Sequence, residues 1–133
     1  MPNDVYDKLL TMRKGKAEIC LNQLKNWGVD VQGNRFNFAS FSKKGHYWME
    51  PSKQVLLEDW TFVLFDESLK KLYQFNIPQN TFTYEVGKSN SLKIRADKPD
   101  LIKLEIKKTP YIDKQSNQDF SNFLVAEITF IVR

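Results

Sequence analysis

The stretch WTFVLFDESLKKLYQFNI, from Trp60 to Ile77, decides the fold. Two runs of apolar and aromatic residues, 60–65 and 71–77, flank the polar residues 66–68, and such runs are typical of strands. A short polar connection makes the two strands antiparallel neighbours, because parallel pairing requires a crossover of about a dozen residues or more. The first run is apolar at consecutive positions, so both of its faces must be covered. The stretch therefore predicts a β-hairpin that is buried on both sides.

Short apolar runs broken by turn residues continue on either side of this hairpin, and they predict two further hairpins. The first joins 35–41 to 46–49, and the second joins 92–96 to 101–107. The polar segment 78–91, which follows the central hairpin, is expected to be a long loop, with a further strand over 81–86 as the alternative.

The C-terminal part predicts a short helix followed by a strand. Residues 116–125 place Phe120, Phe123 and Leu124 on one helical face, which would be the buried one. The run EITFIV, over 127–132, predicts a closing strand.

The N-terminal residues 4–27 have the periodicity of an amphipathic helix, with apolar side chains at i, i+4 and i+7, and this spacing then occurs again. Gly15 interrupts the pattern, and because glycine costs about 1 kcal/mol relative to alanine inside a helix, the segment is either one helix or two. The repeating apolar residues are Val5, Leu9, Met12, Cys20, Leu24 and Trp27.

Together these elements predict an α+β fold in a single domain that spans residues 1–133. The long N-terminal helix would pack on a mainly antiparallel, twisted sheet of about six or seven strands, because each amphipathic element must bury its apolar face against another.

Composition narrows the class of protein. The chain has 133 residues, of which 41% are hydrophobic and 14% aromatic, and this excludes a disordered tail. Its single cysteine and the absence of a signal-peptide pattern favour a cytoplasmic protein without disulfides, and no apolar run is long enough to cross a membrane. One histidine and one cysteine exclude a Cys/His zinc site within one chain, and the dispersed glycines exclude a P-loop or a dinucleotide fingerprint.

The formal net charge of +4 is concentrated in residues 1–53, which contain nine Lys and Arg against five Asp and Glu. At the end of this part, the region 35–60 interleaves basic and aromatic residues. Aromatic faces stack on bases and basic side chains neutralise phosphates, so the region predicts a binding surface for nucleic acid or another acidic partner. The expected binding residues are Arg35, Lys43, Lys44, His46, Tyr47 and Trp48.

Other uses of the same aromatic residues stay open. They can form the core of the sheet, or they can line a pocket for a small planar ligand. The run 60–65 can also be covered on its second face by another copy of the chain, which would make the protein a homo-oligomer.

A second pattern points to metal chemistry. In the alternating run LIKLEIK, over 101–107, Glu105 and Lys107 share one face of a strand. A strand Glu-x-Lys with an aspartate from a neighbouring strand is one way to hold Mg²⁺ and orient a water molecule, and Asp66 is the candidate third residue. This pattern predicts a Mg²⁺-dependent, nuclease-like phosphodiesterase with Asp66 and Glu105 as metal ligands. A solvated strand with alternating charges is the simpler interpretation.

The leading hypothesis from the sequence is therefore a small non-catalytic binding module without a cofactor. Its binding surface would lie in the region 35–60, and the Mg²⁺-dependent phosphodiesterase is the alternative.

Overall fold

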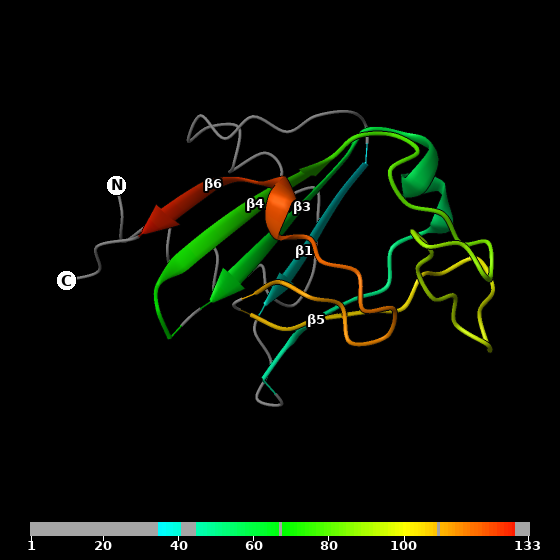
Figure 1. Cartoon of the computed structure of the whole chain (residues 1–133). Helices are drawn as coiled ribbons and strands as arrows, with labels where there is room; N and C mark the ends of the chain where they lie inside the picture. The colour runs from blue at the N-terminus through cyan, green and yellow to red at the C-terminus, as the bar shows by residue number, and fades with distance from the viewer. Residues whose placement is uncertain (1–34, 41–44, 67, 109, 130–133) are drawn as a thin grey trace.

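The computed structural model describes residues 35–40, 45–66, 68–108 and 110–129. Its main element is a four-stranded sheet with the order β1-β3-β4-β6, which Figure 1 shows from β1 at one edge to β6 at the other. The strands are β1 (Arg35–Ser40), β3 (Trp60–Asp66), β4 (Lys71–Ile77) and β6 (Leu124–Thr129).

The central hairpin of this sheet confirms the prediction from its sequence. Strands β3 and β4 pair antiparallel in one unbroken register, from Trp60 opposite Ile77 to Asp66 opposite Lys71. Every residue of β3 is buried. The apolar run therefore lies inside the sheet, between β1 and β4.

A second, smaller sheet consists of β2 (Tyr47–Met49) and β5 (Leu104–Ile106), which pair antiparallel. Single bridges extend β5 at both edges: Ser52 pairs with Leu101, and Ile94 pairs with Ile102. We call the strand 101–106 with its two neighbours, 47–52 and 93–95, the outer ladder. Figure 1 shows β5 apart from the four-stranded sheet.

Both sheets contribute to one hydrophobic core. Tyr47 and Ile106 of the outer ladder pack in the same cluster as Phe62 and Phe75 of the four-stranded sheet. Aromatic rings fill its centre, where Phe62 stacks on Phe75 with 4.8 Å between ring centroids and meets Phe120 edge-on at 5.5 Å. This cluster holds the outer ladder against the larger sheet.

The predicted α+β class is wrong for the part of the chain that the structure describes. These residues form strands and two short 3-10 helices, η1 (Lys53–Leu57) and η2 (Ser121–Phe123), without an α-helix. The predicted helix over 4–27 lies outside the described residues. The predicted sheet of six or seven strands is instead a sheet of four strands and a sheet of two.

The predicted helix over 116–125 is also wrong. Phe120 is fully buried, and Phe123 and Leu124 pack against the core, but they do so from η2 and from the start of β6. Strand β6 includes residues 127–129 of the predicted closing strand and begins earlier, at Leu124, whereas residues 130–132 of that prediction lie outside the described residues. Its pairing with β4 explains the difference, because a strand beside β4 satisfies the backbone groups of both.

The first flanking hairpin does not form. Strand β1 pairs parallel with β3, with Arg35 opposite Trp60, whereas β2 belongs to the outer ladder. Residues 41–59 supply the crossover that parallel pairing requires. The indole N–H of Trp60 donates a hydrogen bond to Asn37 across this pair at 2.8 Å.

The second flanking hairpin forms only in part. Residues 93–95 pair with 101–103, but β5 continues beyond them beside β2. No strand of more than one bridge forms in 78–91, as expected for a loop. Within the described ranges, no helix is long and apolar enough to cross a membrane.

Candidate binding surface

The expected binding residues of the region 35–60 lie in different environments. Arg35 begins β1 at the edge of the four-stranded sheet, and Lys43 and Lys44 lie outside the described residues. Tyr47 is fully buried and His46 is 6% exposed, whereas Trp48 is 41% exposed. Of these, Trp48 is thus the aromatic side chain with a surface for a partner.

Tyr47 points into the core and takes no part in a surface. Its burial raises the pKa of its hydroxyl far above the usual value, and the nearby Asp66 carboxylate and the hydroxyls of Tyr73 and Tyr111 raise it further. Trp60, at the end of the same region, is also fully buried. Tyr47 and Trp60 are therefore core residues, as in the alternative interpretation of the aromatic residues.

Trp48 lies on the opposite face of the outer ladder from Tyr47, because side chains alternate along a strand. The ring of His46 lies beside the Trp48 ring at 4.9 Å between centroids. His46 Nε2 in turn lies 3.1 Å from Glu105 Oε2, at ion-pair distance but without a hydrogen bond, and these two side chains are 8% and 10% exposed. Gln115 donates a hydrogen bond to the other oxygen of Glu105. His46, Glu105 and Gln115 therefore form a packed polar cluster, and the ring of His46 lies beside the indole.

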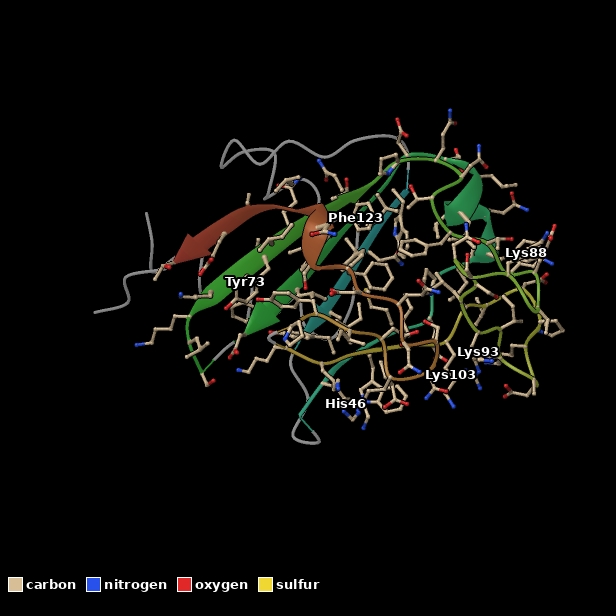
Figure 2. All side chains as sticks on the ribbon, viewed as in Figure 1. His46, Tyr73, Lys88, Lys93, Lys103 and Phe123 are labelled. Atoms are coloured by element: carbon tan, nitrogen blue, oxygen red, sulfur yellow. The ribbon has the colours of Figure 1, made fainter. Side chains whose placement is uncertain are left out.

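Two lysines lie on the same face of the outer ladder as this tryptophan. The bridge between Ile94 and Ile102 places Lys93 directly opposite Lys103, and the Lys103 N–H donates to the Lys93 carbonyl at 2.9 Å. Lys103 is two residues from Glu105, which pairs with Trp48, so Lys103 and Trp48 share a face. We call the surface formed by Trp48, Lys93 and Lys103 the Trp48 face. Figure 2 shows Lys93 and Lys103 close together in the view.

Neither of these lysines forms an ion pair with another described residue. Extending the register places Glu50 opposite Lys103, but the Glu50 carboxylate instead pairs with Arg95 at 2.5 Å. Like charges directly opposite each other destabilise a strand pair. The Trp48 face therefore has positive charge that an anionic partner can neutralise.

Asp66 and Glu105, the residues predicted as metal ligands, lie in different sheets. Asp66 ends β3 on the Tyr47 side, whereas Glu105 points to the Trp48 side of β5, and Lys107 is exposed. The two carboxylates thus have different surroundings and different partners. Among the described residues, no group of three or more His, Cys, Asp or Glu side chains could hold a metal ion.

Asp66 is instead the anchor of the β3–β4 turn. Its buried carboxylate accepts hydrogen bonds from Ser68 Oγ at 2.7 Å, from the Leu69 N–H at 3.2 Å and from the Lys108 ammonium. Burial by itself raises the pKa of this carboxyl, but these three donors outweigh it and hold the pKa below its usual value. Asp66 is therefore a charged structural residue.

Sequence reasoning missed Lys93 and Lys103 as members of a site. Their alternation with apolar residues was visible, but their position opposite each other depends on the register of two chain segments. Comparisons with known proteins found no family model that matches the chain and no similar curated protein or solved structure.

Proposed function

We propose that this protein is a non-catalytic module that binds single-stranded nucleic acid on the Trp48 face. The observation that carries the proposal is an exposed tryptophan, whose ring lies beside that of His46, on the same face as two lysines that have no acidic partner among the described residues. Base stacking on an aromatic side chain contributes about 1–3 kcal/mol and tolerates any base, while lysines neutralise the phosphates.

A single strand fits better than a duplex because bases in a duplex already stack on each other and offer no free face to an indole. The proposal keeps Trp48 from the region 35–60 and adds two lysines from the other strands of the outer ladder. It assigns no role to Tyr47, which is buried. The single cysteine also supports a reducing compartment such as the cytoplasm.

The direct test is a titration of a fluorescently labelled single strand of about 12 nucleotides, a length within usual site sizes. Anisotropy would be measured at about 50 and 200 mM salt, because phosphate contacts make affinity depend strongly on salt. We expect Trp48→Ala to weaken binding roughly 5- to 150-fold, the equivalent of one lost stacking contact. Thermal melting would check that this variant is folded.

The contribution of the two lysines can be measured separately, through the salt dependence of binding. The double substitution Lys93→Gln and Lys103→Gln should lower the slope of log affinity against log salt by about 1.4, because each phosphate contact with a single strand contributes about 0.7. Lys70→Gln, in the β3–β4 turn, is the matched control with the same loss of charge per site. Absence of binding at low salt, or equal binding by the wild type and both sets of variants, would refute the proposal.

A further inference from the structure

A cavity of about 350 Å³ opens beside the Trp48 face. Its walls come from the loop 84–89, from the segment 91–94 and from two residues of the turn after Asp113. Lys93 belongs both to this cavity and to the Trp48 face. In the view of Figure 2, Lys88 and Lys93 lie toward the end of the molecule opposite Tyr73 of β4. The volume is within the usual range for small-ligand sites, which begins at about 300 Å³.

The lining of the cavity is basic and hydroxyl-rich. It contains two lysines, Lys88 and Lys93, and three serines, and no acidic side chain. Lys88 forms no ion pair with another described residue, and neither does Lys93. The positive charge of both ammonium groups is therefore available to a ligand.

Hydrogen bonds already occupy the groups that would repel an anion. The Gln118 side-chain amide donates to the carbonyl oxygens of Ser89 at 2.7 Å and Ser91 at 3.2 Å. The Ser116 hydroxyl donates to Asp113 at 2.5 Å, and this buried carboxylate also accepts from the Ser116 N–H. The wall formed by this turn is thus held in place before any ligand arrives, which lowers the entropy cost of binding.

An aromatic ring completes the lining. Tyr84 lines the cavity and is 40% exposed, and the Lys53 ammonium lies 5.0 Å from the centroid of its ring. A cation at this distance favours an aromatic partner and helps to orient the ring. The cavity therefore combines a charged part that suits a phosphate with a ring that suits a base.

We infer that this cavity binds the phosphate monoester of a nucleotide, either free or at the end of a nucleic-acid strand. Two lysines match a monoester, which has a charge of about −1.5 to −2 near neutral pH, better than an internal diester with a single charge. Binding of a strand end in the cavity rests on the proposed function, because a strand on the Trp48 face would reach the cavity through Lys93. Binding of a free nucleotide in the cavity does not depend on the proposed function.

The experiment compares one oligonucleotide with a 5′-phosphate, with a 3′-phosphate and with hydroxyl groups at both ends. A nucleoside monophosphate, its nucleoside and inorganic phosphate are titrated separately by calorimetry. We expect one phosphorylated form to bind about tenfold more tightly than the hydroxyl form, as one charged hydrogen bond would provide. Lys88→Gln should abolish this preference and leave the affinity for the hydroxyl form unchanged, because Lys88 is not part of the Trp48 face. Lys70→Gln should retain the preference.

The outcomes separate the two proposals. Equal binding of all three oligonucleotides, together with no binding of the monophosphate, would refute phosphate binding in the cavity. It would not contradict strand binding on the Trp48 face. A preference that survives Lys88→Gln would also overturn it, since the phosphate would then bind elsewhere. The protein could also bind the monophosphate, lose that binding in Lys88→Gln, and bind no oligonucleotide. This result would support phosphate binding in the cavity and refute strand binding on the Trp48 face.

Discussion

The β3–β4 hairpin and the outer ladder differ in how their charged side chains are paired. In the hairpin, Asp66 is paired with Lys108, and Lys71 is paired with Glu127 of β6 at 2.7 Å. In the outer ladder, Lys93 and Lys103 lie directly opposite each other without an acidic partner among the described residues. Asp66 and Lys71 of the hairpin are thus neutralised by residues elsewhere in the protein, whereas Lys93 and Lys103 of the ladder keep positive charge that a partner can neutralise. This difference locates the candidate binding surface more firmly than composition does.

The same contrast holds for the aromatic residues. Phe62 is fully buried and contacts three other aromatic rings, whereas Trp48 is 41% exposed and has the His46 ring beside it. We therefore expect substitutions in the hairpin to change stability and substitutions in the ladder to change binding. Four predictions test this division.

The largest expected effect is at Phe62. Phe62→Ala should destabilise the protein by about 3–5 kcal/mol, because it removes a fully buried ring and leaves a cavity in the core. Trp48→Ala is the matched control and should cost less, since that side chain is already 41% exposed. Urea unfolding of both variants would measure the difference. Equal losses at the two positions would contradict the division.

The next effect is at Asp66. Asp66→Asn should cost about 1.5–3 kcal/mol near neutral pH, because hydrogen bonds to a charged group are replaced by weaker ones. The lowered pKa also sets a pH dependence. Stability from this carboxylate is fully present above the unfolded pKa of about 3.9, and it is lost as pH falls through the lower folded pKa.

The wild type should therefore lose stability below about pH 4, and Asp66→Asn should lose less over the same range. Unfolding curves at several pH values would show whether the two converge. Parallel curves would mean that the carboxylate is not the titrating group.

A smaller effect is expected at two turns. Gly87 and Gly45 have φ angles of +89° and +88°, and an added Cβ would meet nothing within 4 Å at either position. Alanine at either site should cost about 1–2 kcal/mol from backbone strain alone. Gly87 also lines the cavity, so Gly87→Ala should weaken monophosphate binding in calorimetry, whereas Gly45→Ala should not. A loss of monophosphate affinity in Gly45→Ala would show that strain at a distant turn reaches the cavity.

The smallest effect has the opposite sign. Lys103→Gln should stabilise the free protein by about 0.2–1 kcal/mol at low salt, because it removes a like-charge pair across two strands. Salt should reduce this gain by screening the repulsion. Lys71→Gln, which removes a paired lysine from the hairpin, should not stabilise. If Lys103→Gln also destabilises at low salt, the two lysines do not repel each other significantly.

Local patterns predicted much of the strand content. The alternation and the aromatic runs correctly indicated the β3–β4 hairpin, strand β2 and the buried positions of Phe120 and Trp60. They failed for 116–125, where a few apolar residues fit a helical spacing by chance and pairing with β4 favoured a strand. Periodicity describes one segment at a time, so it is least reliable where a distant neighbour decides.

The candidate site shows the same limit. The sequence placed both Tyr47 and Trp48 in one candidate binding surface, but adjacent residues on a strand point to opposite faces, and only packing decides which face is the core. Tyr47 became core and Trp48 became surface because the outer ladder lies with its Tyr47 side on the larger sheet.

By itself, the sequence determined that the chain from residue 35 is rich in strands and that Trp60 to Phe65 is covered on both faces. It did so because those properties depend on the spacing of apolar residues within a few positions. Only the tertiary structure decided that β1 lies parallel to β3, that Lys93 lies opposite Lys103 and that a lysine-lined cavity opens beside them. Each of these depends on the register between segments far apart in the chain, and that register follows from how the core closes.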